Sequence, residues 1–194
     1  TVAPEGYAIA TDTTFTLKPD GTIDKDSTSA SVTEDGIVLV EDAKTSVPIS
    51  KVDVTDKEEV EGATLQVIEK DDKGEEHVVH EWTSGKEPEV IEGLKTGVEY
   101  TLRETVAPEG YTIATDTKFT IDEKGKVTTT GSITEDGIIL VEDAKLTTSV
   151  SGAKTWVDND DKAGKRPTSI KINLYKKGGE DISKVETKEV KASD

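Results

Sequence analysis

A lysine and two carboxylic acids each end a segment in which every second residue is apolar. The segments are Val47-Ile49-Lys51, Tyr100-Leu102-Glu104 and Ile139-Val141-Asp143. In a β-strand, residues two apart share one face, so each ionisable group belongs to the face that its apolar partners bury. The spacing therefore predicts one amine and two carboxyl groups inside the same core.

Such a trio has a specific chemistry. An inward charge costs several kcal/mol unless it is paired or neutralised, and burial favours the neutral amine and the neutral carboxylic acid. A neutral amine is a nucleophile, and the hydroxyl of a neutral carboxylic acid can leave as water. A second, protonated carboxyl group can polarise the carbonyl and move protons. The product would be an uncharged amide, and folding would supply an effective molarity of about 10⁵ M or more.

Two alternatives stay open at this level. Glu142 adjoins Asp143 and could be the acyl partner, although the period of two favours Asp143. The three groups could also form a structural ion pair, or be ordinary solvated charges, because charges at strand ends are usually solvated.

An internal repeat sets the organisation of the chain. Residues 1–44 and 105–145 align, from T-V-A-P-E-G-Y to V-E-D-A-K, with one difference of three residues in loop length. The unit is about a hundred residues long, which is the size of a domain. We therefore expect the C-terminal part of a preceding repeat in 1–45, a complete repeat in 46–146 and the N-terminal part of a following domain of a different subtype in 147–194. The chain would begin and end inside domains.

The patterning within 46–146 has a period of two, typical of strands, and Thr and Val favour strands through β-branching. Strands are expected around the segments 64–68, 77–82, 99–104, 118–121, 126–128 and 138–141, with glycine-containing turns between them. Short strands at this spacing predict an all-β fold of tandem antiparallel β-sandwich domains. No long helix is indicated.

Composition excludes several classes of protein. Lys and Arg number 24 against 41 Asp and Glu, a formal net charge of −17, which argues against a nucleic-acid partner. No apolar run is long enough to insert into a membrane. The absence of Cys excludes disulfides and thiolate metal sites. No cofactor is indicated.

Two motifs could suggest metal binding. His77 and His80 lie three apart in an expected strand and so face opposite ways, which disfavours a shared ion. Residues 158–164 resemble a calcium loop only loosely, because Lys162 occupies a ligand position and no glutamate follows at the twelfth. Solvated residues are the better interpretation of both, so no metal site is predicted.

The motifs resemble those of a known family. I-S-K-V-D at 49–53, E-T-V-A-P-E-G-Y at 104–111 and I-L-V-E-D-A at 139–144 are similar to three signatures of collagen-adhesin B-type (Cna-B/SpaA-like) repeat domains of Gram-positive adhesins and pilins. The resemblance implies Ig-like or prealbumin-like sandwiches with a spontaneous isopeptide bond. By matching position, Lys51 is the amine, Asp143 the acyl partner and Glu104 the catalyst. Asp42 and Lys154 match single cross-link positions of the partial domains.

The resemblance also implies a function: a structural stalk or spacer module of a bacterial cell-surface adhesin or pilus. The expected partners are neighbouring repeats of the same chain, with a host surface ligand at a distal tip as a candidate. The expected location is extracellular, with cell-wall anchoring through segments outside these residues. The alternative is a ligand-binding module that grips a host protein or glycan through its loops. A turnover enzyme is not expected, because no catalytic motif of that kind is present.

Overall fold

The computed structural model describes residues 2–178 and 181–191. The chain divides into two compact units, one ending at Thr148 and one beginning at Ser149. The 45/46 domain boundary predicted from the repeat falls inside the first unit. Among the described residues, helical structure is limited to one short 3₁₀ turn, η1 (Lys25–Ser27). No helix among them is long and apolar enough to span a membrane.

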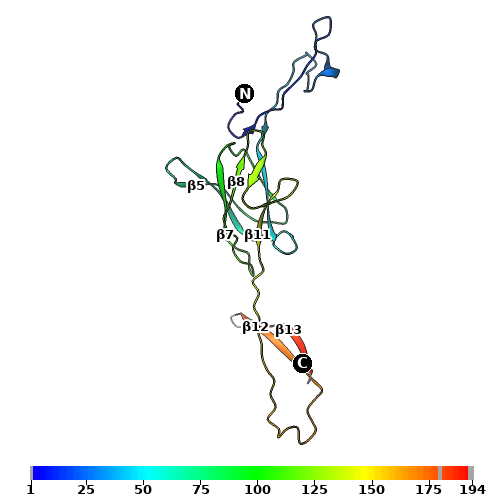
Figure 1. Ribbon diagram of the computed structural model, residues 1–194, viewed down its shortest axis with the longest axis vertical. Helices are drawn as coiled ribbons and strands as arrows, with labels where there is room; N and C mark the ends of the chain where they lie inside the picture. Colours follow the sequence, from blue (N-terminus) through cyan, green and yellow to red (C-terminus); the bar gives the residue numbers. More distant parts are fainter. Residues whose placement is uncertain (1, 179–180, 192–194) are drawn as a thin grey trace. The chain divides into compact units, whose positions relative to one another are not determined.

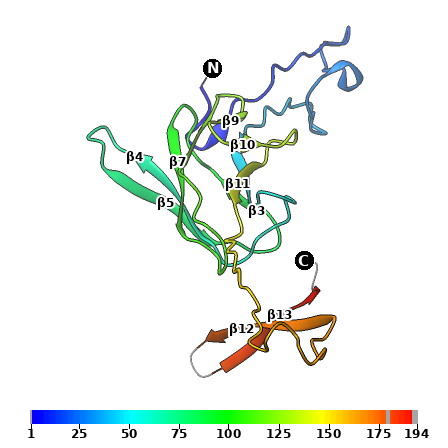
Figure 2. The same ribbon diagram turned by 60° about the horizontal axis from the view of Figure 1, so that its bottom comes forward.

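Two β-sheets form the body of the first unit. The five-stranded sheet has the order β5-β4-β7-β8-β9, and the four-stranded sheet has the order β10-β11-β3-β6. The strands of the first sheet are β4 (Thr64–Lys70), β5 (Glu76–Thr83), β7 (Glu99–Val106), β8 (Thr117–Ile121) and β9 (Val127–Thr129). Those of the second are β3 (Ser46–Asp53), β6 (Glu89–Glu92), β10 (Ser132–Ile133) and β11 (Ile139–Asp143). Figure 2 shows the two layers around one interior. The predicted all-β sandwich is confirmed.

The core lies between these sheets and is built from alternate residues of their strands. β11 shows the alternation most clearly, because Ile139, Val141 and Asp143 are buried while Leu140 and Glu142 are only partly covered. The buried cluster comprises Val47, Ile49, Ala63, Leu65, Val67, Ile91, Leu94, Tyr100, Leu102, Phe119, Ile121, Ile139 and Val141. Tyr100 and Phe119 stack within it, with ring centroids 5.3 Å apart.

One pairing departs from the antiparallel arrangement predicted from sequence. β3 and β11 are parallel neighbours, with Val141 opposite Lys51 and Asp143 opposite Asp53. β10 is antiparallel to β11, and β6 is antiparallel to β3. Strand periodicity predicts which face each side chain takes but not the relative direction of two strands that are distant in the sequence. The first and last strands of this sandwich therefore run side by side in the same direction (Figure 1).

The segment before the sandwich is much less regular. It contains β1 (Tyr7–Ala8) and β2 (Ala43–Lys44), which pair with each other. Between them lie only the isolated bridges Leu17↔Ile23 and Val32↔Val38 and the turn η1. Figure 1 shows this segment as an open loop in blue.

The second unit contains a long antiparallel hairpin. Its strands are β12 (Ser169–Gly178) and β13 (Asp181–Lys191), with a register shift at Leu174/Tyr175. Before the hairpin, residues 151–168 run without strands.

Candidate functional site

The three predicted ionisable groups meet in the core of the sandwich. Lys51 comes from β3, Asp143 from the adjacent β11, and Glu104 from β7 in the facing sheet. The Lys51 Nζ lies 2.6 Å from Asp143 Oδ1 and 3.6 Å from Glu104 Oε1. Each side chain is 1% exposed or less. An amine and two carboxyl groups are thus enclosed together, away from water.

The strand register explains how these groups meet. β3 and β11 are in parallel contact, and Lys51 stands opposite Val141, two residues before Asp143. The Lys51 ammonium donates a hydrogen bond to the Val141 carbonyl, at 3.3 Å, while its Nζ approaches the Asp143 carboxyl. Glu104 stands opposite Leu65 of β4, at the end of the apolar run of β7. All three groups lie where a buried apolar row gives way to polar side chains.

Burial and the neighbouring groups both change the pKa of the Glu104 carboxyl. Desolvation raises the pKa of the Glu104 carboxyl, and the nearby Asp143 carboxyl raises it further. A hydrogen bond from the Ala114 backbone N–H to Glu104 Oε2 and the charge of Lys51 oppose this rise. The net direction is upward, so Glu104 holds a proton to higher pH than an exposed glutamate does.

The hydrogen bonding of the site points to a proton between the carboxyl groups. Glu104 Oε1 and both oxygens of Asp143 are buried and accept no hydrogen bond. The contact of Lys51 with Asp143 is an ion pair at short distance without hydrogen-bond alignment. A proton on Glu104 that is donated to Asp143 would satisfy oxygens that otherwise lack a donor. The arrangement can therefore hold an acid beside the Asp143 carbonyl.

Glu142, the alternative acyl partner, lies on the other face of β11. Its carboxylate accepts a hydrogen bond from Ser132 Oγ, at 2.8 Å, and pairs with Lys57. Both contacts lower the pKa of the Glu142 carboxyl, with Lys57 contributing most. Glu142 is therefore charged and directed away from Lys51, as the period of two predicted.

The two candidates in the partial domains lack such surroundings. The Asp42 carboxylate is exposed and accepts a hydrogen bond from the Ala10 N–H, at 2.9 Å. Lys154 is also exposed, and its Nζ lies 4.0 Å from the centroid of the Trp156 ring. Neither group is brought beside a reaction partner among the described residues.

Sequence reasoning missed a second ion pair close to the site. The Lys145 Nζ lies 2.8 Å from Asp53 Oδ2, and the Asp53 side chain is 2% exposed. Contact with Lys145 lowers the pKa of Asp53, and contact with Asp53 raises that of Lys145. The sequence did contain a signal for Asp53, because it lies two residues after Lys51 and so belongs to the same buried face of β3. The pair joins the ends of β3 and β11, two residues beyond Lys51 and Asp143.

The two histidines do not share a site. His77 approaches Asp71, with 3.3 Å between Nε2 and Oδ2, and His80 approaches Glu89, with 2.9 Å between Nε2 and Oε1. Ligand atoms of Asp71, Glu75 and His77 lie within 4.8 Å of one another at the β4–β5 turn. Asp71 already accepts backbone N–H groups in that turn, which explains the clustering without an ion.

Two family models match the chain. Residues 45–135 match the SpaA prealbumin-like fold domain, and residues 150–194 match the Cna protein B-type domain. The first match contains Lys51 and Glu104 and ends before Asp143. Together the two matches confirm the family resemblance drawn from the motifs.

Similar proteins include surface adhesins and pilins. A collagen adhesin of Staphylococcus aureus is 33% identical over 81 residues, 42% of this chain, and the match spans only 6% of that protein. The structure of the pilus-presented adhesin Spy0125 (Cpa) is 36% identical over 45% of this chain and 19% of that one, with a TM-score of 0.37. The C-terminal domain of the shaft pilin SpaA of Lactobacillus rhamnosus GG is 19% identical over 53% of this chain and 98% of that one, with a TM-score of 0.38.

Proposed function

This chain carries Cna-B/SpaA-like domains, and we propose that residues 46–146 are a covalently locked spacer of a Gram-positive surface adhesin or pilus. The lock is an amide between Lys51 and Asp143, formed with the help of Glu104. The observation that supports it is the enclosure of these three groups, with the amine 2.6 Å from the acyl partner. The module acts outside the cell as part of a wall-associated protein, with neighbouring repeats as its partners.

The reaction follows from the groups present. Lys51 transfers one proton to the Asp143 carboxylate beside it, and the lone pair of the neutral Nζ then attacks Cγ of the protonated Asp143. Glu104, which holds a proton because of burial, donates it toward the Asp143 oxygen that develops charge. A C–N bond forms, the C–OH bond breaks, and one water leaves with the oxygen of Asp143. The second amine proton passes to Glu104, so Glu104 ends the reaction protonated, as it began, and the reaction occurs once per chain.

The product suits its surroundings better than the reactants do. Two opposite charges in a site without water depend on exact pairing, because each unpaired ion costs several kcal/mol. An amide carries no charge, and its formation removes one of the two Asp143 oxygens that lack donors and leaves the other as an amide carbonyl. The core therefore favours the bond, and the strand register holds the reacting atoms together.

The parallel pairing of β3 and β11 gives the bond a mechanical role. Tension that enters at Ser46 runs along β3 to Lys51, crosses the amide to Asp143 and leaves the strand there. Residues 52–142 then lie outside the path of the force, so the sandwich need not unfold when its ends are pulled. The ring also constrains the unfolded chain, and by analogy with a disulfide that closes a comparable loop it would add about 4–5 kcal/mol to the stability.

Intact mass under denaturing conditions tests the proposal. The full chain is expected to be lighter than its sequence by one water, and digestion should yield a branched peptide that joins Lys51 to Asp143. Glu104→Ala should restore the full mass. Glu142→Ala is the matched control, because it removes the neighbouring carboxyl and should keep the deficit. A folded unchanged chain of full mass would refute the cross-link, as would loss of the deficit in Glu142→Ala alone.

A further inference from the structure

A second lysine–aspartate pair lies beside the proposed cross-link, with the roles of the two segments exchanged. β3 provides Lys51 for Asp143 of β11, and the chain just after β11 provides Lys145 for Asp53 of β3. In each segment the lysine and the aspartate are two residues apart, and both aspartates are buried. The two pairs are therefore consecutive ties between the same two segments of the chain.

The second pair is not set up to react as the first does. Contact with Lys145 is the main cause that lowers the pKa of the Asp53 carboxyl, whereas burial raises the pKa of Glu104. Asp53 is therefore a carboxylate, which offers an attacking amine no hydroxyl that can leave as water. Contact with Asp53 raises the pKa of Lys145 in turn, so its half-exposed amine stays protonated. An ion pair of this kind can hold two segments together without being consumed.

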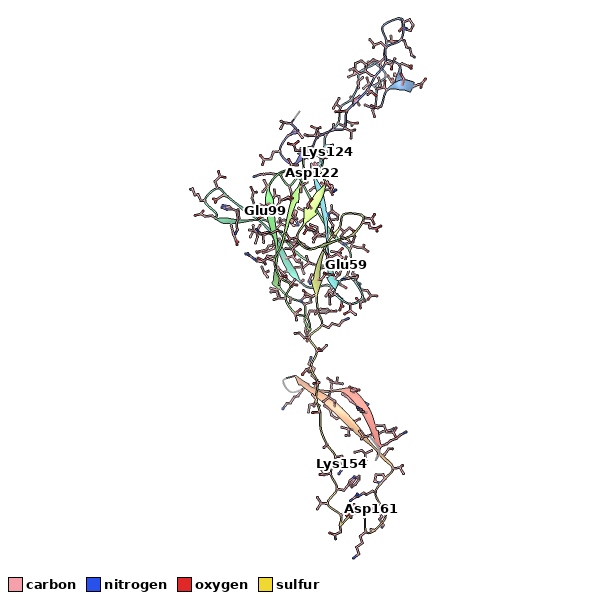
Figure 3. The ribbon with its side chains drawn as sticks, in the orientation of Figure 1. Glu59, Glu99, Asp122, Lys124, Lys154 and Asp161 are labelled. Carbon is pink, nitrogen blue, oxygen red and sulfur yellow. The ribbon has the colours of Figure 1, made fainter. Side chains whose placement is uncertain are left out.

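Asp53 is also fixed from the side of β3. Its Oδ1 accepts a hydrogen bond from the Thr55 N–H, at 2.8 Å. A bridge between Val52 and Glu59 closes the β3–β4 loop around it, and Figure 3 labels Glu59 in this loop. Lys145 is therefore tied to a fixed point at the end of β3.

A short segment after β7 contacts both the chain beyond β11 and the proposed catalyst. Tyr111 forms an antiparallel bridge with Lys145, whose Nζ lies 5.9 Å from the centroid of the Tyr111 ring. Three residues later, the Ala114 N–H donates a hydrogen bond to Glu104 Oε2. A displacement of Lys145 would therefore be passed to the segment that holds Glu104, and also to Asp143, two residues before it.

We propose that Lys145 and Asp53 are positioning residues for the cross-link. Their ion pair holds the end of β11 against the end of β3, so that Cγ of Asp143 stays within reach of the Lys51 Nζ during the reaction. A shift of about one ångström between reacting atoms can slow a reaction about a hundredfold, so a tie two residues away affects the rate measurably. The inference rests on the proposed amide and adds that its rate of formation depends on a charge pair outside the reacting trio.

The time course of cross-linking in the full chain tests this role. The chain is produced in inclusion bodies, dissolved in denaturant, refolded by dilution and quenched at intervals for intact mass, while tryptophan fluorescence follows folding. The one-water deficit should develop in the unchanged chain once it has folded. Lys145→Gln should fold but acquire the deficit about tenfold or more slowly, because the end of β11 is no longer held. Lys145→Arg keeps the positive charge and should recover most of the rate.

Two control variants separate positioning from stability. Lys118→Gln removes a lysine whose Nζ lies 2.6 Å from Glu99 on the five-stranded sheet, where Figure 3 labels Glu99, and should leave the rate unchanged. Ile121→Val shortens a fully buried side chain of β8 and lowers the stability away from the two strand ends. Its rate of cross-linking should also stay unchanged. If Ile121→Val slowed the reaction as much as Lys145→Gln, the rate would follow stability alone and the positioning role would be wrong.

A double variant removes the ion pair without leaving a buried charge unpaired. Asp53→Asn combined with Lys145→Gln should fold and still cross-link slowly, because a neutral hydrogen bond is weaker than a charge-assisted one. Cross-linking of this double variant at the unchanged rate would overturn the positioning role. In that case the unchanged chain would still show its mass deficit, so the cross-link itself would stand. A folded unchanged chain of full mass would instead remove the proposed function.

Discussion

The two copies of the repeated sequence make corresponding short pairings, such as Leu17↔Ile23 and Ile121↔Val127, but bury their side chains very differently. Phe15 and Phe119 occupy equivalent positions, yet Phe15 is 57% exposed and Phe119 only 1%. Leu17 is exposed, whereas its counterpart Ile121 is fully buried in the core. The difference lies in the neighbours. β8 pairs with β7 and β9, whereas residues 14–18 lie in no strand and are bonded only to the nearby residues 22–29, through the bridge Leu17↔Ile23 and backbone hydrogen bonds.

The acidic ends of the two copies differ in the same way. Val141 lies on β11, is buried in the core and leads to the enclosed Asp143, whereas Val40 is exposed and leads to the exposed Asp42. Alternation selects which side chains share a face, but only the partner strands exclude water from that face. The chemistry proposed for Asp143 therefore depends on its surroundings and not on its local sequence.

The largest expected effect separates Asp143 from Asp42. Asp143→Ala should restore the full mass and lower the stability of the sandwich by about 4–5 kcal/mol, because it opens the ring in the unfolded chain. Asp42→Ala should keep the mass deficit and change the stability little. Denaturing mass spectrometry and thermal unfolding check both outcomes. Loss of the one-water deficit in Asp42→Ala would show that the exposed Asp42 reacts, which would contradict the role assigned to burial.

The next effect compares the two phenylalanines. Phe119→Ala removes a fully buried aromatic ring that stacks on Tyr100, and a loss of about 3–5 kcal/mol is expected. Phe15→Ala removes an exposed ring and should alter the stability by no more than about 0.5 kcal/mol. Denaturant unfolding in the Lys51→Ala background measures both without the contribution of the ring. Equal losses would mean that residues 1–45 have a packed core of their own.

A smaller effect on the melting temperature is expected for Lys44 and Lys145, the lysines that follow the acidic residues at the ends of the two copies. Lys145 pairs with the buried Asp53, whereas the Lys44 Nζ lies 4.0 Å from Glu92 Oε2 on the surface. Lys145→Gln should therefore lower the melting temperature more than Lys44→Gln. The pKa of Asp53 is lowered on folding, so its contribution is present above the ordinary aspartate pKa of about 3.9 and is lost as the pH falls through the lowered value.

The pKa of Lys145 is raised on folding, so its contribution is present below the ordinary lysine pKa of about 10.4 and is lost as the pH rises through the raised value. Melting curves should therefore show the largest difference in melting temperature between the unchanged chain and Lys145→Gln at pH values that lie between the ordinary pKa values of aspartate and lysine. The gap should close in strong acid. A gap that does not vary with pH would mean that the loss comes from packing and not from the ion pair.

The amino-acid sequence alone determined the strand alternation, the repeat and the faces of Lys51, Glu104 and Asp143, because side-chain direction in a strand has a period of two. It also carried the motifs on which the family resemblance rests. Only the tertiary structure decided that β3 and β11 are parallel neighbours and that Asp53 pairs with Lys145. Those outcomes depend on which strands and loops meet, and residues far apart in the chain settle that together.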